Sequence, residues 1–353
     1  MSQRTLNIVI TVDPEIPVPP LYYGGIERIV DMLIRGLVNA GCQVSLFANH
    51  ESRVPAALIP YVGRRSNSLK DAFRNALQIK NYIRQNEKID ILHSFSRLAY
   101  LAFIMKSAIP KIQSYQRHIT PRSIFLAKRL AANNITFTAC SKFCAGTADF
   151  MGGDWQVIPN GVNIEKYQFN AGVSSDAPLV FLGRITRVKG VHTAIALAKK
   201  TKRRLLIAGN HAQSGRDYEY FKNEVLPHCD QKTIEYIGEV NDIQKSELLA
   251  TSWALLFPIE WDEPFGIVMV EALACGTPVI AFSRGAVPEV IKHKVTGFVC
   301  NSLAEMIDAV GMIPLIERIN CRNDAQERFS DKVIIDAYLK LYDSCIHKKA
   351  GRV

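Results

Sequence analysis

Short apolar segments alternate with amphipathic ones along this chain, and the alternation runs through the sequence twice. The first series opens with the largely apolar segment 7–12, which a glycine pair and a helical pattern over 26–39 follow. The second series opens at 179–183 and continues with a helical pattern over 190–200. Short apolar runs between amphipathic helices are typical of parallel strands in a sheet that helices cover on both faces. The sequence therefore predicts an α/β protein with two doubly wound parallel sheets.

The break between the two series lies in the segment 157–170, which is rich in turn-forming residues and lacks a helical pattern. We place a first Rossmann-like domain at residues 1–168 and a second at 169–330. The last helical pattern, at about 331–346, is expected to pack back on the first domain. Doubly wound sheets bind ligands beyond the carboxyl ends of their strands, so the default site of two such domains is the cleft between them.

The charge of the chain is unevenly distributed. The formal net charge is +10, but residues 1–170 hold 20 basic and 11 acidic residues, whereas residues 171–353 hold 23 and 22. No apolar run is long enough to span a bilayer, and the N-terminus shows no signal-peptide pattern. The eight cysteines include no Cys-x-x-Cys pair and no cysteine–histidine cluster with zinc spacing. These features predict a cytoplasmic globular protein whose cysteines are reduced.

The segment 260–289, EWDEPFGIVMVEALACGTPVIAFSRGAVPE, carries the most informative motif. Glu263 and Glu271 stand eight residues apart, and a turn with Gly266 separates the first of them from a helix that begins at Ile267. The amides and the positive dipole end of that helix suit a diphosphate. Burying an unpaired carboxylate is costly, so Glu271 in an apolar helix favours a function over an incidental polar residue. A carboxylate on each side of a phosphate-binding turn suits a nucleotide sugar.

Two basic residues stand between the first strand of the second half and the helix that follows it. Arg184 ends the strand, and Lys189 lies just before the helix. A guanidinium and an ammonium on such a turn can neutralise a diphosphate, although in a basic protein they can also be surface charges. Arg187, between them, is expected to face solvent. Because no Asp-x-Asp motif is present and the two cations supply the charge of a metal ion, we predict neither a metal nor a cofactor.

Together these segments resemble the family 4 retaining glycosyltransferases of the GT-B fold. The similarity covers nearly all of residues 5–345, and beyond the Glu-x7-Glu segment it rests on GGIERIV (24–30), DILHSF (90–95), VIPNGVN (157–163) and FLGRITRVKG (181–190). It implies two Rossmann-like domains that face each other across a cleft. It also implies transfer of a hexosyl group from a UDP-sugar, with UDP-glucose or UDP-N-acetylglucosamine favoured, and retention of anomeric configuration.

The resemblance assigns the donor diphosphate to a small group of residues. Arg184 and Lys189 would hold the phosphates and stabilise the leaving group. The backbone amides around Phe265, Gly266 and Ile267 would complete this phosphate site.

The resemblance also assigns residues to the two sugars of the donor. Glu271 would hold the ribose hydroxyls, and Glu263 would hold hexose hydroxyls near C3. His118 would lie over the hexose, although Arg117 replaces the small residue that usually precedes this histidine. Trp261 either lines the sugar pocket or packs as an ordinary aromatic residue.

Six further positions carry weaker expectations. Gly24 and Gly25 would bring a loop close to the donor diphosphate and the acceptor, or they form a plain structural turn. Asn210 and His211 would lie near the ribose and the phosphates. Glu239 and Val240 would hold the base, although loop residues follow strands in any fold of this kind.

These features lead us to expect a metal-independent hexosyltransferase that acts on a glycan, lipid-linked or small-molecule acceptor in cell-surface polysaccharide or glycoconjugate synthesis. A nucleotide-sugar epimerase on the same fold and a non-catalytic nucleotide-sugar-binding protein are the alternatives. Arg117, Arg122, Lys128 and Arg129 surround the apolar segment 123–127. We therefore expect an anionic or lipid-linked acceptor, or peripheral contact with the inner face of the plasma membrane, unless this is merely a soluble basic face. No recognised motif predicts a nucleic-acid partner.

Overall fold

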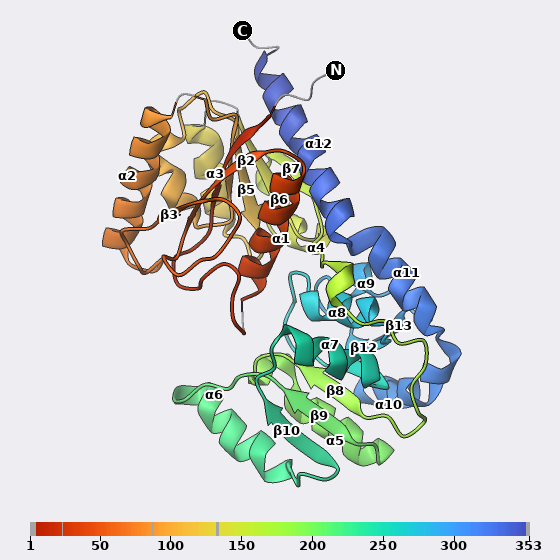
Figure 1. Cartoon of the computed structure of the whole chain (residues 1–353). Helices are drawn as coiled ribbons and strands as arrows, with labels where there is room; N and C mark the ends of the chain where they lie inside the picture. The colour runs from red at the N-terminus through yellow and green to blue at the C-terminus, as the bar shows by residue number, and fades with distance from the viewer. Residues whose placement is uncertain (1–4, 23, 87, 132–133, 351–353) are drawn as a thin grey trace. The chain divides into compact units, whose positions relative to one another are not determined.

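The chain forms two compact units, each built around one parallel sheet (Figure 1). The first unit comprises residues 1–160 and 331–353, and the second comprises residues 161–330. The computed structural model describes residues 5–22, 24–86, 88–131 and 134–350. The predicted fold class, an α/β protein with two doubly wound domains, is confirmed.

The first unit contains a seven-stranded parallel sheet in the order β3-β2-β1-β4-β5-β6-β7. Its strands are β1 (Asn7–Thr11), β2 (Gln43–Ala48), β3 (Ala57–Pro60), β4 (Ile91–Ser94), β5 (Lys111–Tyr115), β6 (Ile135–Ala139) and β7 (Asp154–Val157). Its α-helices are α1 (Gly25–Asn39), α2 (Leu69–Gln85), α3 (Pro121–Leu130), α4 (Lys142–Gly146) and α12 (Asp331–Ala350). The strand order reverses between β1 and β4, which is the switch point where doubly wound sheets bind ligands.

Helix α12 packs into the first unit although it follows the second unit in sequence. It contacts α1, where a Cβ atom on Gly36 would lie 1.9 Å from Cδ1 of Ile335. The two ring nitrogens of His93 in β4 share hydrogen bonds with Oη of Tyr342 (2.7 Å) and Oγ of Ser114 (2.6 Å). Burial lowers the pKa of His93 to about 3, so the imidazole is neutral at physiological pH. A neutral polar bridge therefore ties α12 to the sheet.

The second unit contains a six-stranded parallel sheet in the order β10-β9-β8-β11-β12-β13. Its strands are β8 (Leu179–Leu182), β9 (Leu205–Ala208), β10 (Ile234–Gly238), β11 (Ala254–Phe257), β12 (Val279–Phe282) and β13 (Gly297–Cys300). Its α-helices are α5 (Val191–Thr201), α6 (Gly215–Tyr220), α7 (Asp242–Thr251), α8 (Ile267–Ala274), α9 (Val287–Val290), α10 (Leu303–Met312) and α11 (Arg318–Phe329). The order reverses between β8 and β11, and the loops after these two strands carry Arg184, Lys189 and Glu263.

Sequence analysis predicted neither β3 nor β7. Both are edge strands of the first sheet with a neighbour on one side only. The residues of β3 are all at least partly exposed, and the strand ends in Pro60. Proline is tolerated in an edge strand because one side of the strand forms no hydrogen bonds to a neighbouring strand. Strand β7 (DWQV) contains no apolar run, and the short apolar strand β3 (ALIP) follows Pro55 closely and ends in Pro60.

The division between the units falls between residues 160 and 161, whereas sequence analysis placed the boundary between 168 and 169. The intervening residues bond to the second unit. The N–H of Val162 donates to the carbonyl of Phe329 (2.9 Å), and the N–H of Gln168 donates to Oγ of Ser246 (2.8 Å). The turn-rich composition indicated a connection, but it could not show which unit the connection joins.

Candidate functional site

The loops after β8 and β11 are held together at the carboxyl ends of these neighbouring strands. The N–H of Glu260 donates to the carbonyl of Val188 (2.8 Å). A Cβ atom on Gly190 would lie 1.9 Å from the carbonyl oxygen of Pro258, and the φ of Gly190 is +73°, a value that favours glycine. Only glycine fits this close crossing without strain. The crossing brings the basic loop that carries Lys189 beside the acidic loop after β11.

Glu263 is held in place by two donors. The Nζ of Lys189 lies 2.5 Å from Oε2 of Glu263, and Nε1 of Trp261 donates to the same oxygen at 3.0 Å. The ammonium of Lys189 also lies 5.2 Å from the centroid of the Trp261 ring. The side chains of Glu263 and Lys189 are only 13% and 16% exposed. Glu263 is thus a positioned carboxylate, and no described residue hydrogen-bonds its other oxygen.

Glu271, in the second turn of α8, is held in the same manner. The Nζ of Lys245 from α7 lies 2.5 Å from Oε1 of Glu271, and the hydroxyl of Tyr167 donates to that oxygen at 2.8 Å. The side chains of Glu271 and Lys245 are 7% and 8% exposed. A close opposite charge with a further hydrogen bond offsets the cost of removing a carboxylate from water. Oε2 has no hydrogen-bond partner within the described part of the chain, so both glutamates keep one oxygen for a ligand.

The N-terminus of α8 separates the two carboxylates. Gly266 precedes the helix with a φ of +84°, no side chain caps the helix, and no acidic residue lies in its first turn. Phe265 is buried and packs edge-on against Phe329, with ring centroids 5.8 Å apart. The first amides of a helix have no partner within the helix. This end of α8 therefore presents uncapped N–H groups and a positive dipole end to an anion.

The other predicted positions of the second unit have fewer contacts with the residues around α8. Arg184 is exposed after β8, and the carbonyl of Asn210 after β9 accepts the N–H of Ile185 (2.8 Å). Glu239 and Val240 lie in the loop between β10 and α7. Among the described residues, neither Glu239 nor Val240 forms a hydrogen bond or an ion pair with the rest of the predicted site. Over the same residues, no group of three or more His, Cys, Asp or Glu side chains is arranged to hold a metal ion.

His211, which follows Asn210, has a packing role. Its ring stacks on Phe221, with centroids 4.1 Å apart and planes 7° from parallel, and lies near the ring of Tyr236. The hydroxyl of Tyr236 donates to the carbonyl of Gly209 (2.8 Å). An aromatic cluster thus supports the loop after β9.

In the first unit, the predicted glycine pair lies at the end of the loop after β1. A Cβ atom on Gly24 would lie 2.7 Å from Pro20 and 3.0 Å from Oε2 of Glu27, so a side chain is excluded there. Gly25 begins α1. His118, between β5 and α3, is exposed, and no described residue hydrogen-bonds its ring. The roles that the resemblance implies for the glycines and for His118 stay predictions.

Glu27, which sequence analysis did not single out, is a buried acid next to Gly24. Burial, with a smaller contribution from the charge of Asp13, raises the pKa of Glu27 from an ordinary value of 4.5 to about 7, against the opposing effects of its own backbone N–H and Arg117. Arg117 itself pairs with Asp13 at 2.8 Å. The sequence signal that could have identified Glu27 was an acidic residue in the first turn of the helix that follows the glycine pair.

Lys245 and Tyr167 were also not anticipated. Lys245 stands in the polar stretch NDIQKSE, where a lysine is usually solvated. Tyr167 stands in the turn-rich connection between the two series of strands. Each approaches Glu271 only through the tertiary fold, so neither position carries a local signal.

Two family models match the chain and define its class. Residues 163–326 match the model described as Glycosyl transferases group 1, and residues 23–166 match Glycosyltransferase Family 4. With two Rossmann-like units, the protein is a glycosyltransferase of the GT-B type. It belongs to the family 4 glycosyltransferases, and the resemblance seen in the sequence is confirmed.

Curated relatives match part of the chain. An uncharacterized glycosyltransferase of Methanocaldococcus jannaschii is 32% identical over 159 residues, which are 40% of each protein. The N-acetyl-alpha-D-glucosaminyl L-malate synthase of Bacillus anthracis is 30% identical over 200 residues, 52% of this chain and 50% of that protein. The chain thus spans half or less of the length of these two relatives.

Solved structures match nearly the whole chain. The sucrose-phosphate synthase of Thermosynechococcus elongatus has a TM-score of 0.83 at 18% identity and covers 97% of this chain and 100% of its own. Anabaena HepE in complex with UDP and glucose has a TM-score of 0.74 at 19% identity and covers 96% and 100%. At this identity the likeness shows the fold alone.

We predict that Lys245→Met lowers the free energy of unfolding by about 3 kcal/mol or more, because it leaves the buried carboxylate of Glu271 without its cation. Tyr167→Phe removes one hydrogen bond and should cost about 1 kcal/mol. Urea unfolding of the full chain measures both. The double variant Lys245→Met with Glu271→Met should recover most of the loss, since no unpaired buried charge remains and Asp242, the other partner of Lys245, is exposed. A Lys245→Met variant as stable as the parent would contradict the assignment.

We predict that Glu27→Gln changes how stability depends on pH. Between pH 4.5 and about 7 the folded parent binds the Glu27 proton more tightly than the unfolded chain does, so its free energy of unfolding falls as pH rises. The glutamine variant lacks this loss, and its stability relative to the parent should increase from about pH 5 to about pH 8 in urea unfolding. Glu51→Gln, at an exposed position of the same unit, serves as the control. A parallel pH dependence in the parent and Glu27→Gln would refute the prediction.

Proposed function

We propose that the protein is a retaining, metal-independent hexosyltransferase that takes its sugar from a UDP-sugar, with UDP-glucose or UDP-N-acetylglucosamine favoured. The observation that carries the proposal is the arrangement around α8. Two positioned carboxylates, each with one oxygen available, stand on either side of an uncapped helix N-terminus, and Lys189 lies beside the first. A donor with a diphosphate between two hydroxylated sugars matches this order of groups. The HepE complex with UDP and glucose supports the proposal by likeness of fold.

In this proposal the diphosphate binds at the N-terminus of α8. Arg184, Lys189 and the amides from Phe265 to Ile267 meet the negative charge that develops on the leaving group, in the manner of preorganised electrostatic stabilisation. The ion pair with Lys189 also reduces the repulsion between the Glu263 carboxylate and the phosphates.

The two glutamates act as positioning groups in this proposal. Oε2 of Glu271 accepts from the ribose hydroxyls, and the remaining oxygen of Glu263 accepts from hexose hydroxyls. Asn210 lies toward the ribose and the phosphates, while Glu239 and Val240 serve the base. The carboxylates are not a hydrolase pair, since each is already engaged by a lysine.

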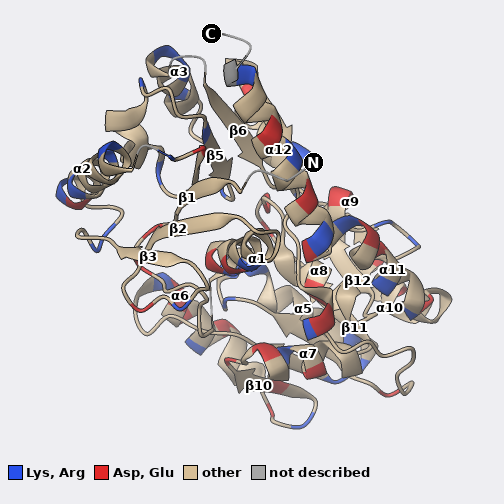
Figure 2. Ribbon diagram, turned by 45° about the horizontal axis from the view of Figure 1, so that its top comes forward, with Lys and Arg blue, Asp and Glu red and all other residues tan. Residues whose placement is uncertain are grey.

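Helix α3 of the first unit exposes an apolar pair with basic residues around it. Phe125 and Leu126 are each 54% exposed, whereas Ile124 and Ala127 of the same helix are buried. The exposed basic residues around this apolar pair are Arg122, Lys128 and Arg129 (Figure 2). No described helix is both long and apolar enough to cross a bilayer. We propose that α3 contacts the anionic surface of a membrane at which a lipid-linked acceptor is held.

A screen of UDP-, GDP- and ADP-sugars for slow hydrolysis tests the donor. UDP-glucose or UDP-N-acetylglucosamine should be consumed in preference, in the presence of a chelator. With that donor, Lys189→Met should lower turnover by about a hundredfold or more, as expected for loss of an electrostatic contact to developing charge. Arg187→Met is the matched control, because Arg187 stands in the same loop but pairs with Glu224. A loss below tenfold for Lys189→Met would reject the leaving-group role.

The products of the same screen separate the alternatives. An epimerase would release an isomerised nucleotide sugar from the donor alone. A non-catalytic binding protein would bind UDP in calorimetry without turnover over an acceptor panel. Glu271→Gln is the variant of choice for ribose binding, because glutamine keeps the size of the side chain and an oxygen for Lys245. Unchanged UDP affinity in Glu271→Gln would contradict the ribose assignment.

Flotation with liposomes tests the membrane contact. Binding should increase with anionic lipid content, and the double variant Phe125→Ser with Leu126→Ser should reduce it severalfold, because an apolar pair contributes to interfacial binding. Leu69→Ser with Phe73→Ser, an exposed apolar pair on α2, is the control. Binding that does not depend on the anionic lipid content would rule out the α3 surface. Binding that only the double variant on α2 reduces would also rule it out.

A further inference from the structure

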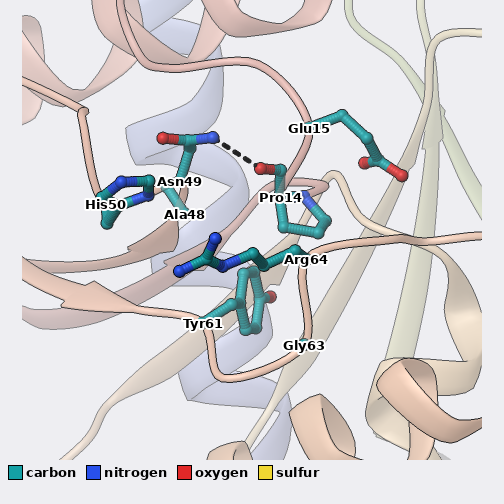
Figure 3. Close-up of a pocket in the computed structure, with 8 residues that line it drawn as sticks. All are labelled: Pro14, Glu15, Ala48, Asn49, His50, Tyr61, Gly63 and Arg64. Atoms are coloured by element: carbon teal, nitrogen blue, oxygen red, sulfur yellow. Dashed lines mark hydrogen bonds between the residues drawn. The ribbon is translucent and has the colours of Figure 1, made fainter.

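The first unit contains a hollow at the carboxyl ends of β1, β2 and β3. Its volume is about 240 Å³, and the residues that line it are Pro14, Glu15, Ala48, Asn49, His50, Tyr61, Gly63 and Arg64 (Figure 3). Pockets for drug-sized ligands measure about 300–1,000 Å³. The hollow therefore suits a small ligand such as a single sugar ring. None of its lining residues is among those that the resemblance assigns to the donor.

The walls of the hollow are fixed by hydrogen bonds between loops. Nδ2 of Asn49 donates to the carbonyl of Pro14 (2.8 Å), as Figure 3 shows. The N–H of Gly63 donates to Oδ1 of the buried Asn75 (2.7 Å), and its carbonyl accepts from Nδ2 (3.0 Å). A Cβ atom on Gly63 would lie 2.6 Å from Cβ of Asp71, so the loop after β3 packs closely on α2. A preorganised wall of this kind lowers the entropy that binding costs.

A buried polar chain connects the hollow to the switch point of the sheet. The hydroxyl of Tyr61 shares a hydrogen bond with Oγ of Ser96 (3.4 Å), and that oxygen donates to Oγ1 of Thr11 (2.8 Å). Thr11 ends β1 and Ser96 follows β4, the two strands between which the order reverses. The hollow thus lies at the carboxyl ends of the strands, next to the switch point at which doubly wound sheets bind ligands.

The charges at the hollow favour an anion. In Figure 3 the guanidinium of Arg64, the ring of His50 and the amide of Asn49 gather at one end, while the carboxylate of Glu15 points away at the other. That carboxylate accepts the N–H of Ser66 (2.5 Å). The guanidinium of Arg64 has no carboxylate partner among the described residues. By contrast, Arg117 pairs with Asp13 in the same unit.

We propose that this hollow binds the acceptor through an anionic group, either the phosphate of a sugar phosphate or the carboxylate of a sugar acid. Arg64 takes the anion with a pair of N–H groups, and His50 and Asn49 stand beside it. Their polar atoms also suit the hydroxyls of a sugar ring. The inference rests on the proposed function, because only a transferase needs an acceptor.

The test is calorimetric titration of the full chain with glucose 6-phosphate, glucuronate and glucose. At least one of the two anionic probes should bind more tightly than glucose. Arg64→Met should weaken that binding tenfold or more, whereas Arg65→Met should not. Arg65 is the matched control, since it is the exposed neighbour outside the hollow and its N–H, like that of Arg64, donates to Asp71. UDP affinity should stay the same in both variants.

Equal binding of the anionic probe by Arg64→Met and the parent, or equal binding of glucose and the anions, would overturn the inference. UDP binding without binding of any anionic probe would overturn it while leaving the proposed function intact. Failure of UDP to bind would instead contradict the proposed function. Displacement of bound glucose 6-phosphate by vesicles that contain phosphatidic acid would support a lipid-borne phosphate as the source. Bound glucose 6-phosphate that such vesicles do not displace would support a soluble one.

Discussion

Parallel strand direction is the constraint on which the rest of this structure depends. In a parallel sheet all carboxyl ends lie at one edge, so loops that are far apart in sequence open side by side. Lys189 follows β8, Asn210 follows β9 and Glu263 follows β11, and these strands are neighbours in one sheet. The helix N-termini of a doubly wound sheet begin at the same edge. Carboxylates, cations and uncapped amides therefore converge without any long-range sequence pattern.

The two units surround their buried acids with different partners. In the second unit a lysine ammonium lies against the carboxylate of each of Glu263 and Glu271. In the first unit Glu27 has no cation at hydrogen-bond distance among the described residues, and burial raises its pKa to about 7. A carboxyl group with that pKa carries a proton in a large fraction of molecules at neutral pH. In that form it can donate a hydrogen bond, which an ionised carboxylate cannot do.

A buried ion pair adds little stability over a well-packed apolar pair, because desolvation cancels most of the attraction. The pairing of Lys245 with Glu271 is thus better explained by position than by stability. Two donors on one carboxylate oxygen fix the direction of the other oxygen. The same arrangement recurs at Glu263, with Trp261 in place of tyrosine. Repetition of one device at both ends of α8 is consistent with a ligand that both carboxylates must reach.

The parts of this structure that sequence could predict are those with a local signal. The central strands are buried apolar runs, and the start of α8 follows from Gly266 and the spacing of two glutamates. Strand β7 lacks such a run, and the short apolar strand β3 follows Pro55 closely and ends in Pro60, which counts against a strand. Lys245 has the surroundings of a solvated helix residue, and only the fold places it against Glu271. The hollow around Arg64 combines three separate loops, so no segment of the sequence contains its pattern.

The uneven charge of the chain follows from how the two units use their cations. In the second unit Lys189, Lys245 and Arg187 each have a carboxylate partner, and its nearly balanced charge reflects such pairs. In the first unit Arg64 has none among the described residues. A diphosphate can be bound by a few aimed groups whose own charges are largely neutralised. Binding a diphosphate does not need an excess of cations without carboxylate partners. The basic charge of the first half is therefore better explained by an anionic partner of that unit than by the nucleotide.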